Sequence, residues 1–285
     1  MTVSDYQLNR RQLLRGFGAV VALPALASLA ACGNSGNANA SAAAQRKFIV
    51  GFDQDFPPYG YVGDNGEYTG FDLDLAKAVC DRKGWQFEAV PINWDAKDGM
   101  LNSGQITCIW NGFTIEGRED SYAFTDAYMN NCNVVVVKAD SDIKALTDLA
   151  GKKVVVQTDS GAEKLLADPE GQASLAATFA GGKPETIGEY NTAFMSLEQG
   201  TYDAIAVDEP VANFHTAGKT STFRILDEKL NSEHYGVGFA KGDVDLAAEV
   251  ESTLQELVKD GTVKKICEKY ADQGISFNNW CLPEG

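Results

Sequence analysis

The chain has 285 residues, a length that suits one large domain or two domains of moderate size. Hydrophobic residues make up 44% and charged residues 22%, an ordinary globular composition that excludes a disordered, collagen-like or polytopic membrane protein. The 40 acidic residues outnumber the 24 basic ones, so nucleic-acid binding through a basic face is not expected. Only two histidines, His215 and His234, are present, which leaves little material for a histidine-based metal or catalytic cluster.

The first 31 residues have the pattern of a signal peptide. Arg10, Arg11 and Arg15 form a charged start, and an apolar run follows over residues 16–31. That run is shorter than the about 20 residues that a membrane-spanning helix needs, and it ends in the small residues typical of a cleavage site. We therefore predict that residues 1–31 direct export and are then removed.

A lipid anchor is expected directly after the signal. Leu29-Ala30-Ala31-Cys32 resembles the lipobox of bacterial lipoproteins, in which the cysteine is acylated, here with palmitate, and becomes the first mature residue. Residues 32–45 are mostly Gly, Asn, Ser and Ala, a composition that predicts a flexible tether. The expected location is the outer face of the cytoplasmic membrane, at the cell surface or in the periplasm. Arg10-Arg11 resembles a twin-arginine export signal, and the ordinary secretory route is the alternative.

Five cysteines follow Cys32, an odd number, and export permits disulfides. Cys267 and Cys281 flank a short C-terminal stretch and are the candidate disulfide. Cys80 and Cys108 could pair or stay buried and reduced. The chain has no CxxC motif and no cysteine spacing typical of zinc, so neither a thiol oxidoreductase nor a metal site is expected, and no cofactor is predicted.

Strand-like apolar runs alternate with helical periodicity along the mature chain. In the first half, strands are predicted at 47–52, 86–91, 106–110 and 133–138, and helices at 70–82 and 98–103. In the second half, strands are predicted at 153–157, 204–207 and 235–239, and helices at 142–149, 162–167, 192–198, 209–215, 244–259 and 263–270. This β-α-β order favours mostly parallel sheets covered by helices, in two α/β units of about 90–100 residues each.

Six short motifs then resemble one family, in its order. They are 50–59 (VGFDQDFPPY), 68–75 (YTGFDLDL), 111–114 (NGFT) with Arg118, 156–161 (VQTDSG), 203–210 (DAIAVDEP) and 235–242 (YGVGFAKG). The resemblance, over residues 47–270, is to the bacterial extracellular solute-binding proteins of the polar amino acid class, family 3. It implies the α/β fold of type II periplasmic binding proteins, with two lobes joined by two hinge crossovers. Lobe 1 is expected at 46–130 and 235–285, and lobe 2 at 131–234.

The resemblance also implies residues that bind an amino acid, whose carboxylate and ammonium both need partners when buried. Arg118 is predicted to hold the α-carboxylate, because a guanidinium matches it with two parallel hydrogen bonds. Further carboxylate contacts and cavity walls are expected from Asn111, Gly112, Thr114, Ser160 and Gly161. The spacing from Thr114 to Arg118 is four residues where the family commonly has five, and a surface arginine is the alternative.

Asp208 is predicted to bind the α-ammonium, because it follows the apolar strand 204–207 directly. Its alternative role is to cap the following helix, and Ser160 has the same alternative. Phe56, Tyr59 and Trp94 are expected to form apolar walls, with core packing as the alternative for each. Asp53 and Gln157 are expected to contact the ligand side chain, which favours a polar, donor-bearing one. A turn aspartate is the alternative for Asp53.

The predicted function is that of a substrate-binding lipoprotein of an ABC importer. It would bind a polar amino acid between its lobes and deliver it to a membrane permease, as a monomer and without catalysis. A ligand sensor for a receptor partner and a dehydratase-like enzyme on the same scaffold are the alternatives. The enzyme is disfavoured because binding accounts for Asp53 and Asp208, and no histidine lies in a motif. The sequence does not identify the amino acid; glutamine, arginine, lysine and cystine all fit.

Overall fold

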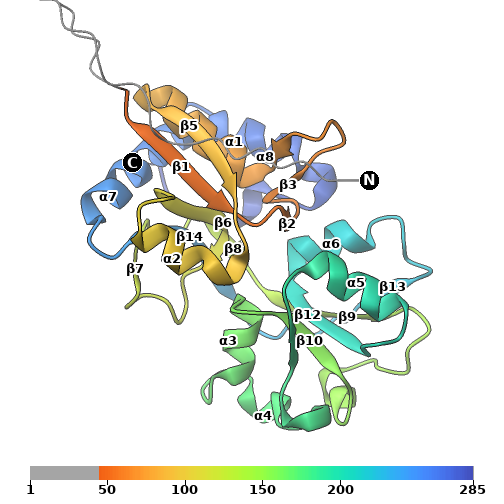
Figure 1. Ribbon diagram of the computed structural model, residues 1–285. Coiled ribbons are helices and arrows are strands. Elements are labelled where there is room, and N and C mark those ends of the chain that lie inside the picture. The colour runs from red at the N-terminus through yellow and green to blue at the C-terminus, as the bar shows by residue number, and fades with distance from the viewer. Residues whose placement is uncertain (1–44, 285) are drawn as a thin grey trace, which may run out of the picture. The chain divides into compact units, whose positions relative to one another are not determined.

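The computed structural model describes residues 45–284, which belong to one compact unit (Figure 1). The predicted signal peptide at 1–31, the lipidation residue Cys32 and the tether up to residue 44 lie outside the described residues. Within 45–284, no helix is both long and apolar enough to cross a membrane.

The first sheet has the strand order β5-β1-β6-β14-β7, and β8 also pairs with β14. Its strands are β1 (Lys47–Phe52), β5 (Gln86–Pro91), β6 (Cys108–Thr114), β7 (Tyr122–Phe124), β8 (Met129–Asn131) and β14 (Glu233–Ala240). β1 runs parallel to β5 and β6, whereas β14 runs antiparallel to β6, β7 and β8. The sheet is therefore mixed, and its last long strand comes from the far end of the chain.

The second sheet has the order β11-β10-β12-β9-β13. Its strands are β9 (Asn133–Lys138), β10 (Val154–Gln157), β11 (Glu185–Ile187), β12 (Ala204–Asp208) and β13 (Phe223–Ile225). β10 is parallel to β11 and β12, and β9 is antiparallel to β12 and β13. All four valines of β9 are buried, as expected for a strand covered on both faces.

A small antiparallel sheet follows β1 and consists of β2 (Asp55–Phe56), β3 (Gly60–Val62) and β4 (Tyr68–Thr69). It ends at Gly70, whose φ is +145° and whose missing Cβ would lie 2.1 Å from the carbonyl oxygen of Tyr59. Only glycine fits this close approach, which lets helix α1 begin at the next residue.

Helices α1 (Phe71–Lys83), α7 (Val244–Lys259) and α8 (Thr262–Lys269) pack on one another beside the first sheet, and α2 (Lys97–Asn102) contacts β6 and β14 (Figure 1). The C-terminal helices therefore return to the first sheet, as predicted. The second sheet contacts α3 (Gly161–Ala167), α5 (Tyr190–Glu198) and α6 (Glu209–Thr216), and α4 (Ala173–Ala176) packs on α3. Short 3-10 turns lie at Trp94–Ala96, Leu146–Leu149, Ala180–Gly182, Ala271–Gln273 and Phe277–Asn279.

We call the first sheet with β2–β4, α1, α2, α7 and α8 lobe 1, and the second sheet with α3–α6 lobe 2. The boundaries predicted at 130/131 and 234/235 stay a prediction. The long predicted elements agree with the structure within about two residues, apart from β6, which continues to Thr114. The helix predicted at 142–149 is wrong, because only the short turn Leu146–Leu149 forms there. The sequence prediction also missed β2–β4, β7, β8, β11, β13 and α4, which are all four residues long or shorter.

The cysteines of the described residues are all free. The candidate disulfide between Cys267 and Cys281 is therefore not formed in the structure. Cys267 is buried on α8 in the main apolar cluster, whereas the Cys281 thiol donates to the carbonyl oxygen of Ala127 at 3.4 Å, so the two sulfur atoms have different surroundings. Cys80 and Cys108 are buried and reduced, and burial raises the pKa of Cys80 to about 12.

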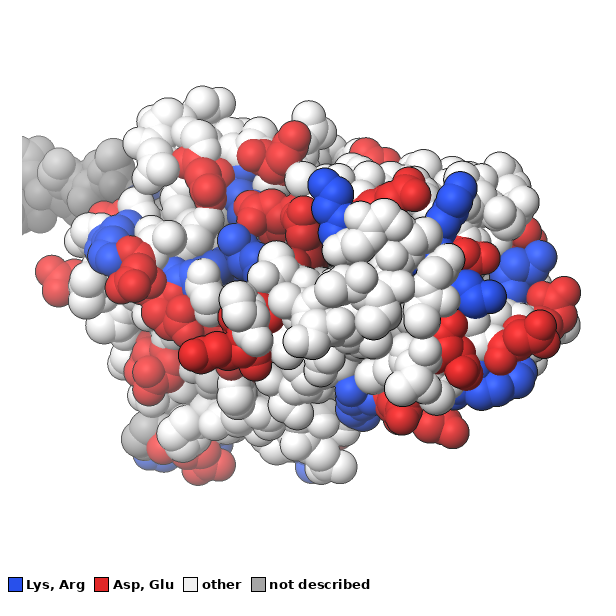
Figure 2. Space-filling model, turned by 90° about the horizontal axis from the view of Figure 1, so that it is seen from below, with Lys and Arg blue, Asp and Glu red and all other residues white. Residues whose placement is uncertain are grey.

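Acidic and basic side chains are interspersed over the face drawn in Figure 2, with no broad basic patch on it. Ion pairs between exposed side chains connect α1 to α7. Arg82 pairs with Glu256 at 3.2 Å and Lys83 with Glu249 at 2.8 Å. Exposed pairs of this kind contribute little to stability, so the buried apolar clusters hold the lobes together.

Candidate functional site

Ten of the twelve predicted ligand-binding residues line one small cavity, together with Phe113. They are Phe56, Trp94, Asn111, Gly112, Thr114, Arg118, Gln157, Ser160, Gly161 and Asp208. The first six belong to lobe 1 and the last four to lobe 2, so the cavity lies between the lobes. It leaves about 10 Å³, roughly the space of one water molecule. A larger ligand can enter only when these walls move apart.

The cavity forms where strands of both sheets end. β6 ends at Thr114, β10 at Gln157 and β12 at Asp208. The carboxyl ends of strands in such sheets meet at a crevice, which is why residues far apart in the chain converge here. Gly112 has a φ of +57°, and its backbone N–H donates to the buried carboxylate of Asp72 at 2.6 Å. Asp72 also accepts from the Tyr128 hydroxyl, and burial raises its pKa to about 7.

Arg118 is buried in the cavity wall, which excludes the surface alternative. Its Nη1 donates to the carbonyl oxygen of Thr114 at 3.1 Å, and its Nη2 donates to the carbonyl oxygen of Asp159 at 2.8 Å. The guanidinium also lies 4.9 Å from the ring centre of Phe113. Its Nε is buried without a hydrogen-bond partner, and burial lowers the pKa of Arg118. The four-residue spacing from Thr114 thus still aims the guanidinium inward.

Asp208 lies opposite, at the end of β12, and is buried. Its Oδ1 accepts hydrogen bonds from Asn131 Nδ2 at 2.8 Å and from the Tyr235 hydroxyl. Burial, followed by the nearby carboxylate of Glu233, raises the pKa of Asp208 to about 7. Its side chain makes no capping hydrogen bond to α6, so the capping alternative does not describe it.

Thr114 and Ser160 both line the cavity and are both hydrogen-bonded to protein groups. The Thr114 hydroxyl donates to Glu233 Oε1 at 3.0 Å. Ser160 Oγ accepts from the backbone N–H of Glu163 at 3.1 Å, so it caps α3 as well as lining the cavity. The capping alternative for Ser160 is therefore confirmed, and its contact with the ligand stays a prediction.

Asp159 connects the lobes. Its carboxylate pairs with Lys97, and its carbonyl oxygen accepts from Trp94 Nε1 at 3.2 Å and from Arg118. The Lys97 side chain is only 1% exposed, which is rare for a lysine. This burial lowers the pKa of Lys97. Asp159 has a φ of +55°, an unusual conformation for a residue other than glycine. One residue of lobe 2 thus receives three polar contacts from lobe 1.

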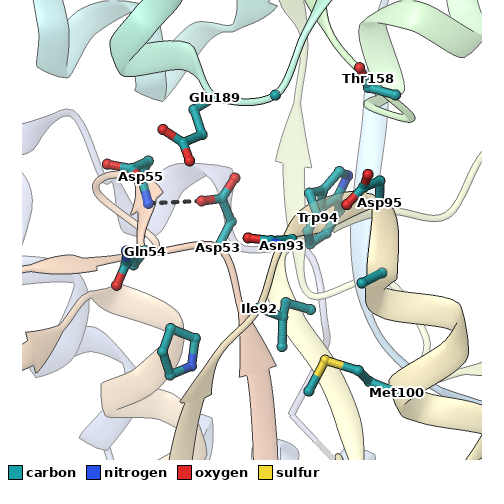
Figure 3. A pocket seen from close by; sticks show the side chains of 13 residues that line it. Asp53, Gln54, Asp55, Ile92, Asn93, Trp94, Asp95, Met100, Thr158 and Glu189 are labelled. Atoms are coloured by element: carbon teal, nitrogen blue, oxygen red, sulfur yellow. Dashed lines mark hydrogen bonds between the residues drawn. The ribbon is translucent and has the colours of Figure 1, made fainter. Parts of the chain in front are cut away.

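Asp53 lines a second cavity of about 570 Å³, whose wall also includes Trp94. Figure 3 shows Asp53 and Glu189 reaching toward the same space from opposite sides. Asp53 accepts from the backbone N–H of Asp55 at 2.8 Å and from Gln157 Nε2 at 2.6 Å, so it is a turn aspartate and also contacts lobe 2. Burial raises its pKa to about 6. Four carboxylates line this cavity, from Asp53, Asp55, Asp95 and Glu189, and no lysine or arginine does.

Tyr59 differs from its prediction. Its ring is buried against the rings of Phe71 and Tyr235, with an edge-to-face distance of 5.2 Å to Tyr235, and it lines neither of these two cavities. It is therefore a core residue, which was its alternative. The loop after β1 carries Phe56 to the cavity but turns Tyr59 under the small sheet, a difference that spacing alone does not show.

Four further residues belong to the site and were missed from the sequence: Lys97, Asn131, Asp159 and Glu233. Asp159 lies inside the motif 156–161, and Lys97 lies three residues after Trp94, but a charged residue in such a place usually lies on the surface. Asn131 and Glu233 lie beside the predicted lobe boundaries at 130/131 and 234/235. A buried charge cannot be recognised in a segment without periodicity, so only the structure identifies these four.

The family model for bacterial extracellular solute-binding proteins, family 3, matches residues 48–273. The L-cystine-binding protein TcyJ of Escherichia coli (strain K12) is 29% identical over 225 residues, which are 78% of this chain and 81% of that protein. The arginine-binding extracellular protein ArtP of Bacillus subtilis (strain 168) is also 29% identical, over 85% of this chain and 92% of that protein.

Solved structures agree with these relatives. A substrate-binding protein of an ABC uptake transporter from Streptococcus pneumoniae with bound histidine has a TM-score of 0.75 and 30% identity, over 81% of this chain and 94% of that one. An ancestral arginine-binding protein bound to arginine has a TM-score of 0.72 and 35% identity, over 79% and 98%. The predicted two-lobed fold of type II periplasmic binding proteins is confirmed. Because the family model spans nearly all of the described residues, the chain belongs to the bacterial extracellular solute-binding proteins, family 3.

Proposed function

We propose that this protein binds a polar L-amino acid between its lobes and delivers it to the permease of an ABC importer. One observation carries the proposal: Arg118 and Asp208 have opposite charges, are both buried and line the same interlobe cavity. A free amino acid carries the two complementary charges. The relatives are named for the amino acids they bind, and they are binding proteins rather than enzymes.

The α-carboxylate is assigned to Arg118. The guanidinium now donates to two backbone carbonyl oxygens, of Thr114 and Asp159, and keeps Nε free. A carboxylate is a stronger acceptor than a carbonyl for a guanidinium, because it carries a full negative charge and can accept two parallel hydrogen bonds. The backbone N–H of Gly161, the first residue of α3, adds a further donor beside it. The α-ammonium is assigned to Asp208.

The ligand side chain is assigned to the space that Asp53, Gln157 and Trp94 border. Asp53 has neutral donors as its hydrogen-bond partners, and the neighbouring 570 Å³ cavity adds three more carboxylates. A purely apolar ligand side chain would displace water from these acceptors without supplying a donor in its place. This favours a side chain with N–H donors. Relatives and solved neighbours are named for arginine, glutamine, histidine and cystine, all of them polar.

The finer cellular assignments rest on the sequence. We propose that residues 1–31 are a signal peptide, that Cys32 carries the lipid anchor and that the protein acts as a monomer outside the cytoplasmic membrane. The family description as extracellular supports export. The hinge crossovers are assigned to residues 130–132 and 232–235, where β8, β9 and β14 meet.

A thermal-shift screen of the mature protein against the twenty L-amino acids and L-cystine tests the proposal. A ligand at a hundredfold excess over its dissociation constant should add about 2.7 kcal/mol to the free energy of unfolding. Arg118→Met should abolish that shift, and the matched control Arg224→Met should keep it, because Arg224 donates to Ser141 and Ile143 within lobe 2 and lines neither cavity. Failure of every amino acid to shift the wild-type unfolding temperature would contradict the proposal.

A further inference from the structure

Two carboxylates, not one, lie at the Asp208 end of the cavity. Asn131 Nδ2 donates both to Asp208 Oδ1 at 2.8 Å and to Glu233 Oε1 at 2.7 Å. A single amide nitrogen therefore bridges the two side chains. Asp208 is 3% exposed and Glu233 is 2% exposed, so solvent screens neither charge.

Neither carboxylate forms an ion pair within the described residues. Glu233 accepts only from neutral donors: Thr114 Oγ1 at 3.0 Å, Asn131 Nδ2, Asn133 Nδ2 at 2.7 Å and Asn231 Nδ2 at 3.0 Å. Asp208 accepts from Asn131 and Tyr235. Two buried negative charges that share one donor repel each other, and each also loses its hydration. This arrangement is stabilised by a cation placed between them.

Glu233 lies next to residues that line the ligand cavity. A Cβ added to Gly161 would lie 2.7 Å from Thr114 Oγ1 and 3.3 and 3.4 Å from the two oxygen atoms of Glu233. Gly161, Thr114 and Asp208 all line the cavity, so the Glu233 carboxylate stands immediately behind that wall. The lack of a side chain on Gly161 keeps this approach open.

Other polar atoms of the same wall indicate a charged ligand independently. Arg118 Nε and Asn111 Oδ1 are buried without hydrogen-bond partners, their residues are 3% and 2% exposed, and both residues line the cavity. Buried polar atoms are normally paired, and leaving one unpaired costs about 1–3 kcal/mol. The unpaired Nε donor of Arg118 suits the carboxylate end of an amino acid.

We propose that Glu233 is a ligand-binding residue, and that the α-ammonium sits between the carboxylates of Asp208 and Glu233. This inference rests on the proposed function. An ammonium offers three N–H donors. Two go to the carboxylates, and the third goes to a neutral oxygen of the wall. Thr114 Oγ1 suits this because its proton is already committed to Glu233, so its oxygen can only accept a further bond.

Binding of an ammonium between these two carboxylates should change the number of protons that they hold. The charged and titratable groups that face it are Arg118, Tyr59, Tyr190 and Tyr235, and these phenols have pKa values raised by burial. Asp208, with a pKa of about 7 raised by burial and by Glu233, is partly protonated near pH 6.5. An ammonium placed beside it favours the ionised form, so binding releases a proton at that pH.

The test titrates wild type and Glu233→Gln by calorimetry at pH 6.5, in two buffers with different ionisation enthalpies. The probe is the tightest binder among L-arginine, L-glutamine, L-histidine and L-cystine, with the same molecule lacking its α-amino group as the second probe. Glu209→Gln is the matched control, because Glu209 adjoins Asp208 but faces Cys132 and Lys229. Glu233→Ala replaces the glutamine variant if the latter does not fold in a thermal melt.

Glu233→Gln should weaken the amino acid tenfold or more, change the affinity of the deaminated probe less than threefold, and release fewer protons than wild type. Glu209→Gln should change neither affinity more than threefold. Equal losses for both probes would make Glu233 a structural hinge residue and overturn the inference, as would an amino acid affinity within threefold of wild type. If wild type binds no amino acid, the proposed function falls as well, so the two failures are distinguishable.

Discussion

Replacing Lys97 by Met tests whether the contacts of Asp159 hold the two lobes together around ligand. The substitution keeps an unbranched side chain of similar length but removes the ammonium that pairs with Asp159 across the lobes. The Trp94 and Arg118 contacts reach the backbone of Asp159 and are untouched. The perturbation therefore removes one interlobe ion pair and, within lobe 1, the hydrogen bond from Lys97 Nζ to the carbonyl oxygen of Trp94 at 3.2 Å.

The magnitude follows from the surroundings of the two charges. A hydrogen bond between charged groups contributes about 1.5–3 kcal/mol. Part of that is already offset, because the closed form must desolvate Lys97, whose pKa burial lowers. Asp159 is 34% exposed and keeps Lys164 at 3.1 Å, so it is not left as an isolated buried charge. We expect a net loss of about 1–2 kcal/mol in the closed form, which is about 5–30-fold in ligand affinity.

Calorimetric titration of the ligand against wild type, Lys97→Met and Lys164→Met measures this. Lys164 is the matched control, since it pairs with the same carboxylate from within lobe 2 and keeps that contact whether the lobes are open or closed. Lys164→Met should stay within threefold of wild type. Adding Asp159→Gly to Lys97→Met should cause little further loss of affinity, because the interlobe pair is already absent and glycine suits a φ of +55°. Equal affinities for Lys97→Met and Lys164→Met would refute the reasoning.

Three further predictions follow from single residues. Arg118→Lys should raise the dissociation constant about 10–100-fold, because a point charge cannot donate two parallel bonds to a carboxylate, and calorimetric affinity within threefold of wild type would contradict this. Burial raises the pKa of Asp72 from its ordinary 3.8 to about 7 in the folded state, so its contribution to stability is complete below pH 3.8 and is lost as pH rises toward 7. Urea unfolding of wild type should therefore show stability falling by up to about 4 kcal/mol from this residue over that window, and Asp72→Asn should show a flatter curve. Gly70→Ala should lower the unfolding temperature far more than Gly66→Ala does. The new Cβ at position 70 would lie 2.1 Å from the carbonyl oxygen of Tyr59, whereas nothing lies within 4 Å of a Cβ at position 66. Equal decreases in unfolding temperature would show that the contact at position 70 is relieved without cost.

Much of the site could be predicted because its residues stand at strand ends inside recognisable motifs. Arg118 and Asp208 are of the residue types that a zwitterion requires, and a strand end faces the crevice whatever the details of packing. Tyr59 shows the limit of this reasoning. It lies three residues after Phe56, in the same motif, yet the small sheet turns it into the core. Spacing along a loop does not determine which side of it a ring occupies.

Glu233 and Lys97 could not be predicted, for a different reason. Glu233 reaches Thr114 across 119 positions of sequence, and Lys97 reaches Asp159 across 62. A charged side chain is ordinarily solvated, so its burial depends on partners that only the folded chain brings near. The pairing of β14 with β6 and β8 brings Glu233 to Thr114 and Asn131.

The sequence by itself determined the family, the order of the long helices and strands, and the two opposite charges of the site, since periodicity and residue chemistry are local properties. The tertiary structure alone decided that Tyr59 packs in the core, that Cys267 and Cys281 stay apart as thiols, and that a second carboxylate joins Asp208. Those outcomes depend on distances between residues remote in the chain, and such distances exist only once both sheets are assembled and their strand ends meet.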